Sequence, residues 1–268
     1  MLDALLRIGR AALPRGARQR LRRAMFDWLE LTWTTSSGIG LRVANYNEWI
    51  IYNEIFVDGE YDAAIAAAIA GRAAGRPLRL LDLGANTGFF TLRVFDRLRA
   101  AGLSDADCTA TLVEANPDLI PVLRARVHDD NPFVDRADIV AGAAGEPTGI
   151  VILYPSFESP GDSSVIRRTD TSGVTVRCVD LMRLAGDGPI DLLKCDVEGA
   201  ELTVIERYPQ LLQRTRVAVF ELHHDLVSVE RCRDGLRAAG LAHETILRDR
   251  GGHSLRMFTS GISGTQSP

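Results

Sequence analysis

Short apolar runs alternate with helix-length amphipathic segments from residue 78 almost to the end of the chain. Seven runs have the length and apolar content of strands, namely Leu78–Leu83, Ala110–Glu114, Ile139–Gly142, Ile190–Asp196, Val217–Leu222, Glu244–Leu247 and Leu255–Thr259. Helical periodicity marks segments between them, notably Phe89–Ala101, Pro117–Val127, Ala200–Tyr208 and Leu226–Ala239. Continuous apolar strands separated by helices are typical of a parallel sheet covered on both faces. The pattern therefore predicts a doubly wound α/β fold.

The first quarter of the chain has a different pattern, which predicts helices and no strand. The expected helices are Leu2–Leu13, a stretch around Leu21–Leu31, and Trp49–Ala70 with a break at Asp58-Gly59. We therefore divide the chain into a helical extension or lid over 1–74, a main domain over 75–260 and a flexible tail over 261–268. The extension is the surface through which we expect any oligomer to form.

Two further extended runs, Ile150–Tyr154 and Val174–Val179, interrupt the alternation of strands and helices. The segment between them, Ser156–Ser172, is polar, and Pro155, Pro160 and Gly161 in and beside it disfavour a packed element. We predict an inserted flap at about 150–178 that covers a ligand site. A plain surface excursion is the alternative.

Charge changes this picture only at the N-terminus. The chain carries 31 Lys and Arg against 35 Asp and Glu, a net charge of −4, yet seven arginines fall between Met1 and Arg23. Such an arm suits nucleic acid or an anionic membrane, or it is a solvated helix. Because Lys194 is the only lysine, arginine clusters are ordinary in this chain. That favours the solvated helix, and we expect no nucleic-acid partner.

Cysteine spacing and hydropathy bear on the compartment. Four cysteines stand far apart without a CxxC pair, which favours neither a disulfide framework nor a zinc cage. No apolar run approaches the roughly 18 residues that span a bilayer. These features predict a cytoplasmic protein without a membrane span.

The strand Leu78–Leu83 runs into a glycine turn, Gly84-Ala85-Asn86-Thr87-Gly88, and a helix that opens at Phe89. Gly84 allows a sharp turn, and Gly88 allows a ligand and the helix to approach the backbone. Asn86 stands where a dinucleotide site has its second glycine, so a pyrophosphate would meet a side chain there. No Gly-Lys-Ser/Thr follows, which excludes a phosphate-binding loop of that type.

Acidic residues flank this turn. Asp82 precedes the first glycine by two residues and places negative charge at the mouth of the turn, and Glu114 ends the next strand, where a carboxylate can grip a ribose diol. Both features favour S-adenosylmethionine, which carries an ammonium and a sulfonium, over NAD. The small residues around Ala143 either leave room for an adenine ring or form a tight turn.

Two later strands also end in groups that can carry chemistry. Lys194, Asp196 and Glu198 close one of them, and Glu221 and His223 close the next. Strand ends of this kind deliver side chains to the crevice beyond the sheet, so we expect the last four to converge as acid/base groups or as ligands of a divalent cation. A lysine in an arginine-rich chain suggests a role that needs a tunable pKa, although a structural ion pair is the alternative, and His223 can also be a simple loop cap.

Taken together, these segments resemble the FkbM family of S-adenosylmethionine-dependent methyltransferases. The resemblance rests on Leu81–Phe90, Glu114-Ala115-Asn116-Pro117, Val179-Asp180-Leu181 and Lys194–Glu201, followed by Glu221. It implies a class I methyltransferase fold, with a Rossmann-like, mostly parallel sheet closed by an antiparallel strand. It also implies methyl transfer, most often to an oxygen of a sugar, polyketide or other secondary metabolite. Asn53–Tyr61 looks like the family's lead-in helix, in which Glu54 and Tyr61 border the cofactor.

These observations lead to one functional prediction with named alternatives. We predict O-methylation of a small-molecule acceptor; N-methylation and an NAD-dependent oxidoreductase are the alternatives. Methyl transfer needs mainly orientation of the acceptor, and an alcohol also needs a base. We expect a metal-free site in which His223 can act as that base near neutral pH. A divalent cation held by the carboxylates is the alternative.

Overall fold

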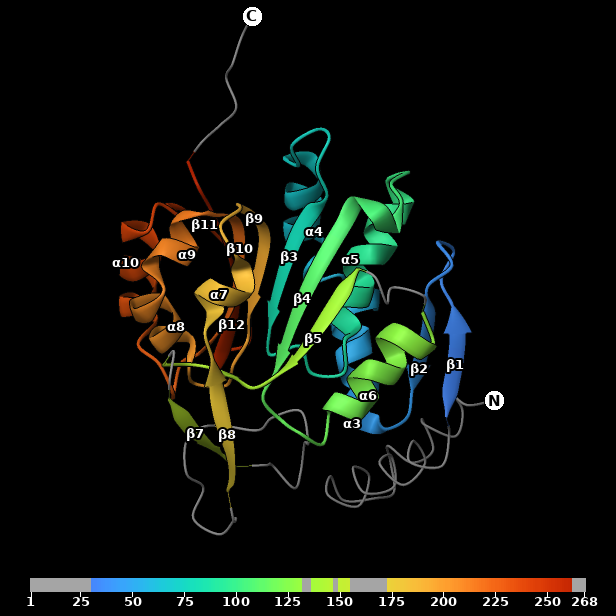
Figure 1. The fold of residues 1–268 in the computed structure, drawn as a ribbon, viewed down its shortest axis with the longest axis horizontal. Coiled ribbons are helices and arrows are strands. Elements are labelled where there is room, and N and C mark those ends of the chain that lie inside the picture. The colour runs from blue at the N-terminus through green and yellow to red at the C-terminus, as the bar shows by residue number, and fades with distance from the viewer. Residues whose placement is uncertain (1–29, 132–135, 147–148, 155–172, 262–268) are drawn as a thin grey trace, which may run out of the picture.

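The computed structural model describes residues 30–131, 136–146, 149–154 and 173–261. A seven-stranded sheet in the order β11-β12-β10-β9-β3-β4-β5 forms its centre (Figure 1). The strands are β3 (Leu78–Leu83), β4 (Cys108–Glu114), β5 (Ala137–Ala141), β9 (Ile190–Cys195), β10 (Thr215–His223), β11 (His243–Asp249) and β12 (His253–Thr259). β3, β4, β5, β9 and β10 pair in parallel, whereas β12 is antiparallel to both of its neighbours. All seven predicted strands and the doubly wound fold are confirmed.

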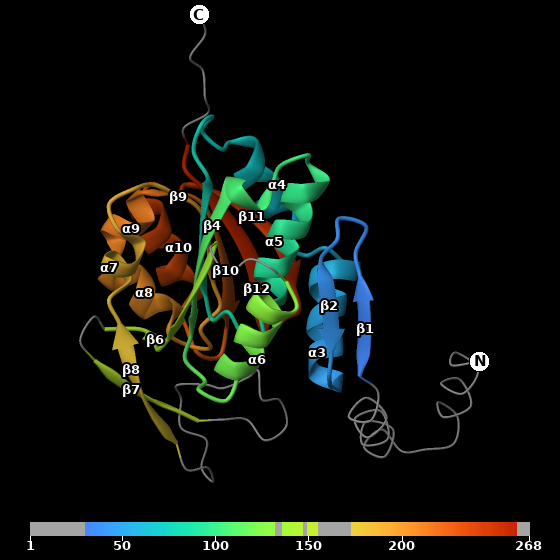
Figure 2. The same ribbon diagram turned by 45° about the vertical axis from the view of Figure 1, so that its right-hand side comes forward.

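Helices cover both faces of the sheet, as Figure 2 shows from the side. One face carries α4 (Asp62–Ala70), α5 (Phe89–Ala100) and α6 (Ile120–Arg124), which continues as the π-helix η3 (Ala125–Asp129); the 3₁₀ turn η2 (Asp105–Asp107) follows α5. The other face carries α7 (Leu181–Ala185), α8 (Glu201–Arg207), α9 (Pro209–Gln213) and α10 (Val229–Ala238). Each face has its own apolar cluster. Every residue of β9 is therefore buried, as expected for a central parallel strand.

The N-terminal region differs from the all-helical prediction. β1 (Leu31–Thr34) and β2 (Gly40–Val43) form an antiparallel hairpin before α3 (Tyr46–Tyr52) and the π-helix η1 (Asn53–Val57). Burial alternates along these strands, and Leu41 and Val43 are buried while their neighbours are not. Four-residue strands are too short for this period-2 pattern to stand out in sequence. The break between η1 and α4 is confirmed, and the expected helix at Leu2–Leu13 lies outside the described residues.

A smaller hairpin projects near the carboxyl ends of the parallel strands (Figure 1). β7 (Ile150–Leu153) pairs antiparallel with β8 (Val174–Val179), which also pairs with the short β6 (Ala143–Ala144). These two extended runs are as predicted. The segment Ser156–Ser172 lies outside the described residues, so the flap stays a prediction. All four cysteines are free, and no helix in the described ranges has the length and hydropathy to cross a bilayer.

Candidate active site

The glycine turn lies where the ends of β3 and β9 meet. Gly84 has φ +74°, and a Cβ added there would lie 1.8 Å from the carbonyl oxygen of Asp196. Only glycine fits so close to another backbone. Asn86 also has a positive φ, +51°, a left-handed conformation that asparagine tolerates better than most non-glycine residues. The close approach of the Asp196 backbone to Gly84 therefore sets the path of the turn.

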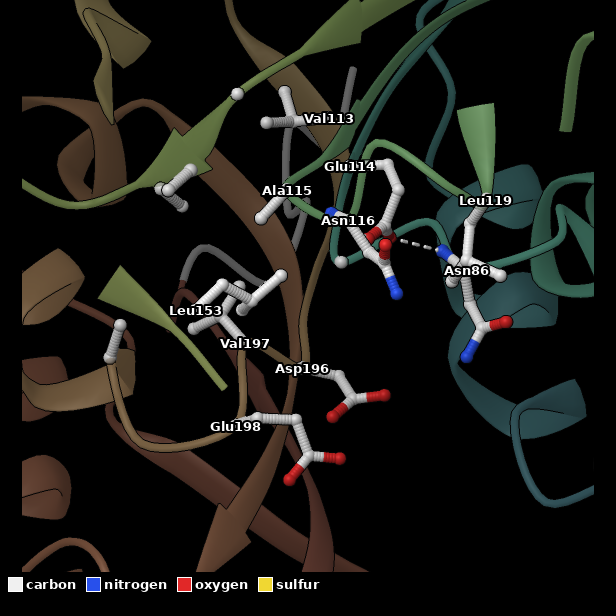
Figure 3. Close-up of a pocket in the computed structure, with 15 residues that line it drawn as sticks. Asn86, Val113, Glu114, Ala115, Asn116, Leu119, Leu153, Asp196, Val197 and Glu198 are labelled. Carbon is white, nitrogen blue, oxygen red and sulfur yellow. Dashed lines mark hydrogen bonds between the residues drawn. The ribbon is translucent and has the colours of Figure 1, made fainter. Parts of the chain in front are cut away.

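Glu114, at the end of β4, fastens the turn from the other side. Its Oε2 accepts a hydrogen bond from the backbone N–H of Asn86 at 2.7 Å, and its Oε1 accepts one from the N–H of Asn116 at 2.7 Å (Figure 3). Burial raises the pKa of the carboxyl, although these two N–H donors act in the opposite direction. Each oxygen keeps a second lone pair. A held carboxylate with spare acceptor capacity suits a vicinal diol.

A first cavity opens beside this carboxylate. Figure 3 shows Asn116, Asp196 and Glu198 gathered around the same space. The remaining wall consists mostly of small and apolar residues, among them Val113, Leu119, Gly142, Ala143, Ala144, Leu153 and Val197. Among the described residues that line this cavity are three carboxylates, from Glu114, Asp196 and Glu198, and no lysine or arginine. Such a site attracts a cation and repels a phosphate.

A second cavity adjoins the first and shares Asn86 and Asp196 with it. The N-terminal elements provide one wall, through Ile51, Glu54, Ile55 and Tyr61, and the start of α5 provides another. Strand ends close the cavity with Lys194 and Glu221. The predicted residues Ala85 and Phe89 line it as well. Because two residues belong to both cavities, one elongated ligand can extend from the first into the second.

Asp82 was expected at the mouth of the turn, but it lies beneath the turn. Its carboxylate is fully buried, accepts a hydrogen bond from the Thr91 hydroxyl at 2.8 Å, and lies 3.5 Å from the Lys194 ammonium. The cause is the position of β3 at the centre of the sheet, where both faces are covered. Asp82 and Gly88 line neither cavity. Asp82 instead contacts Thr91, near the start of α5, and the Lys194 ammonium.

Lys194 is held in its charged form. Its ammonium donates to the carbonyl of Gly84 at 2.5 Å and lies 3.4 Å from Asp196. Burial acts to lower the pKa of this lysine, but Asp196 and Asp82 outweigh burial and raise it. The tunable, lowered pKa suggested by the sequence is therefore absent, and the ion-pair alternative describes the residue better. Lys194 supplies a fixed positive charge at the floor of the second cavity.

His223 is likewise not a neutral base. Its Nδ1 lies 3.2 Å from Glu201 and its Nε2 lies 3.3 Å from Glu198. Burial acts to lower the pKa of the imidazole, but Glu201, Glu198 and Asp196 raise it to about 10. A histidine with that pKa is protonated near neutral pH and cannot accept a proton. This pKa disfavours His223 as the base, and the sequence did not reveal Glu201 as its partner.

Ligand atoms of Asp196, Glu198 and His223 lie within 4.8 Å of one another, and Glu221 is close enough to Asp196 and His223 to interact with them electrostatically. Their roles as acid/base groups or as cation ligands stay a prediction. The first three groups have the arrangement that the cation alternative requires. Both imidazole nitrogens, however, already face carboxylates, which explains the cluster as an ion pair of a protonated histidine. The metal-free prediction is retained on that ground.

Glu221 combines a place in the second cavity with a pKa near neutral pH, which His223 does not. It lines the second cavity, and its Oε1 accepts a hydrogen bond from Arg248 at 2.7 Å. Burial raises the pKa of its carboxyl to about 7, with Asp196 acting in the same direction and Arg248 against it. A carboxylate with that pKa can take up a proton near neutral pH. Glu221 is the residue of the predicted set best suited to act as a base.

Some lining residues were not predicted. Thr87, Phe90 and Ile51 line the second cavity, and Leu119 and Leu153 line the first. Thr87 and Phe90 stand within the glycine-turn motif and could have been found from it. Leu153 lies in the predicted flap and Ile51 in the predicted N-terminal lid, but no local signal singles out either residue.

A buried arginine, also unpredicted, ties the N-terminal elements to the turn. Arg126, in η3, has no exposed surface. Its guanidinium donates to the carbonyls of Thr87 and Arg42, at 2.7 and 2.9 Å, and to the carboxylate of Glu48 in α3, at 2.9 Å. It also stacks on the Phe89 ring, 4.3 Å from the centroid. One side chain thus connects β2, α3 and the turn.

The mostly parallel sheet with the antiparallel strand β12 and a glycine turn after β3 defines a Rossmann-like fold. A family model described as a methyltransferase FkbM domain matches residues 82–251. The chain therefore belongs to the FkbM methyltransferase family, as its motifs predicted. No sequence among the curated proteins matches it.

Three solved structures are among those that resemble this chain. The FkbM methyltransferase of Methylobacillus flagellatus KT is 16% identical, with a TM-score of 0.50, and the match covers 68% of this chain and 43% of that one. Monomeric WbdD is 17% identical, with a TM-score of 0.43, over 75% of this chain and 41% of the other. Fibrillarin of Aeropyrum pernix, with natively bound S-adenosylmethionine, is 14% identical, with a TM-score of 0.46, over 86% and 82%. The chain spans less than half the length of the first two.

Proposed function

We propose that this protein transfers the methyl group of S-adenosylmethionine to a hydroxyl group of a small molecule, such as a sugar or another secondary metabolite. The observation that carries the proposal is the first cavity beside the glycine turn, where three carboxylates and no basic side chain stand among the described residues that line it. A sulfonium and an ammonium suit that charge, whereas the pyrophosphate of NAD is repelled by it. The oxidoreductase alternative is disfavoured for the same reason.

The residues present fit this cofactor. Glu114 offers two held oxygens to the ribose hydroxyls, and Gly142 and Ala143 keep the wall flat enough for an adenine ring. Asn86 and Asp196 lie where the two cavities join. When bound, S-adenosylmethionine supplies a methyl group that is already activated by its sulfonium.

The protein's own part is to orient the acceptor and to remove a proton. Glu54, Tyr61 and Phe89 enclose the second cavity and exclude water from it. Glu221 would take the hydroxyl proton as the acceptor oxygen bonds to the methyl carbon, whose bond to the sulfonium sulfur breaks to leave the neutral thioether. The Lys194 ammonium offsets the negative charge of Asp82 and Asp196. An amine acceptor also needs to lose a proton, so N-methylation is the second possibility that this geometry supports.

We predict that Glu114→Ala weakens the binding of S-adenosylmethionine by about 1 to 3 kcal/mol, since the ribose hydroxyls lose their acceptor. Isothermal titration calorimetry with S-adenosylmethionine, its demethylated product and NAD measures this directly. Asp118→Asn is the matched control, because Asp118 is exposed and lines neither cavity. Wild-type protein that binds NAD more tightly than S-adenosylmethionine would overturn the proposal.

A further inference from the structure

Arg248 joins Glu221 to the N-terminal wall of the second cavity. Its Nη2 donates to Oε1 of Glu221 at 2.7 Å, and its Nε lies 2.9 Å from Oε2 of Glu60. Side-chain exposure is 10% for Arg248, 13% for Glu221 and 10% for Glu60, so the bridge is largely shielded from water. Glu60 directly precedes Tyr61, which lines the cavity.

A register shift in the sheet makes this contact possible. Glu221 in β10 and Arg248 in β11 both lie opposite Leu255, on the two sides of β12. Pairing along β11 and β12 is regular as far as Ile246 opposite Arg256, and there the register shifts. Without the shift, Leu247 would stand opposite Leu255 and Arg248 would point to the other face of the sheet. Bulges next to active sites commonly redirect a side chain in this way.

We propose that Arg248 is a positioning residue for methyl transfer, which the bulge in β11 directs at Glu221 so that its carboxylate stays fixed toward the acceptor cavity. This rests on the proposed function. Arg248 lines neither cavity itself, so it acts on the acceptor cavity through the residues that it holds, Glu221 above all. By holding Glu60 with the same guanidinium, it also keeps the cavity wall around Tyr61 in place.

Several titratable and charged groups face Glu221, and Arg248 differs from them in contacting its carboxylate with a permanent positive charge. The groups that face Glu221 from the packed elements are Tyr61, Lys194, Asp196, His223, Arg248 and His253. Arg248 and His253 contact its carboxylate directly, at 2.7 and 3.4 Å. Burial lowers the pKa of His253, and Arg248 lowers it further. Arg248 is therefore the permanent cation on this carboxylate.

The chain offers a matched control. Arg250 belongs to the same ion-pair network, where it contacts Glu54 and Glu60, but it has no contact with Glu221 among the described residues. Its side chain is 42% exposed. Arg248→Gln and Arg250→Gln remove the same charge from neighbouring positions, and only the first removes it from Glu221.

The test follows two readouts as a function of pH, the kcat/KM of methyl transfer and the ¹³C signal of the Glu221 carboxyl in unliganded protein, identified by its loss in Glu221→Gln. Arg248→Gln should move both midpoints up by about 1 pH unit or more, because the carboxylate loses its cation. Arg250→Gln should leave both at their wild-type positions. The midpoints of Arg248→Lys should fall between those of wild type and Arg248→Gln, because an ammonium keeps the positive charge but lacks the planar pair of N–H donors of a guanidinium.

An unchanged midpoint in Arg248→Gln, or an equal shift in Arg250→Gln, overturns the proposal. If Arg248→Gln does not fold, Arg248→Lys decides: a wild-type midpoint with wild-type kcat contradicts a positioning role. The carboxyl signal separates this inference from the proposed function. Absence of methyl transfer in wild-type protein refutes the function, whereas the midpoint of Glu221 still reports whether Arg248 holds it.

Discussion

Replacing Arg126 with methionine should lower the free energy of unfolding by about 3 to 5 kcal/mol, the usual effect of removing one partner from a buried ion pair. Glu48 is only 4% exposed and would lose the guanidinium that faces it, which leaves a buried carboxyl without its ion-pair partner. The carbonyls of Thr87 and Arg42 would also lose a donor. Urea denaturation followed by circular dichroism gives the free energy directly.

Two variants make that result specific. Arg124→Met, at an exposed position on α6, should change stability by no more than about 0.5 kcal/mol. Adding Glu48→Leu to Arg126→Met should recover much of the loss, because replacing a buried pair by apolar residues is often close to neutral. A loss below about 1 kcal/mol in the single variant would show that Arg126 does not hold the N-terminal elements to the turn.

Replacing Glu221 with glutamine should lower kcat for methyl transfer by about 10² to 10⁴-fold, the usual contribution of a general base. Glutamine keeps the shape of the side chain but cannot accept the proton. In wild-type protein the rate should rise with pH through about 7, because the Glu221 carboxyl must lose its proton before it can act. The variant should lack this rise. Radiolabelled methyl transfer to a panel of hydroxylated sugars and polyketides measures both effects.

Cofactor affinity and an exposed control separate chemistry from folding in this experiment. Glu221→Gln should bind S-adenosylmethionine within about 1 kcal/mol of wild type, and Glu230→Gln, at an exposed position in α10, should retain full turnover. The base assignment fails if Glu221→Gln stays active while chelation abolishes wild-type turnover and magnesium restores it. In that case Asp196, Glu198 and His223 would be ligands of a cation.

The sheet could be predicted from sequence because each strand is marked by the length and apolar content of its own segment. Leu78–Leu83 and Ile190–Cys195 are strand-length runs between helices, each with four apolar residues out of six, and this length and composition are typical of buried strands. β1 and β2 could not be predicted in this way, because four residues carry too little periodicity. Their stability comes from packing Leu41 and Val43 against distant core residues.

The members of the site were easier to predict than their states. Glu114, Asp196 and Glu221 stand at strand ends, and the topology of a parallel sheet brings those ends together. The state of a titratable group depends on neighbours that sequence does not place beside it. Glu201 makes His223 a cation, and Arg248 reaches Glu221 only through a bulge. The environment of Asp82 was not predictable for the same reason, because the position of β3 inside the sheet buries a carboxylate that was expected at the mouth of the turn.

A crystal structure with bound S-adenosylhomocysteine tests the central claim most directly. We predict the ribose hydroxyls on the Glu114 carboxylate, the adenine against Ala143, and the sulfur between Asn86 and Asp196, with the second cavity and Glu221 ahead of it. Density for the nucleoside elsewhere, or a Glu114 carboxylate that does not touch the ribose, would contradict the account.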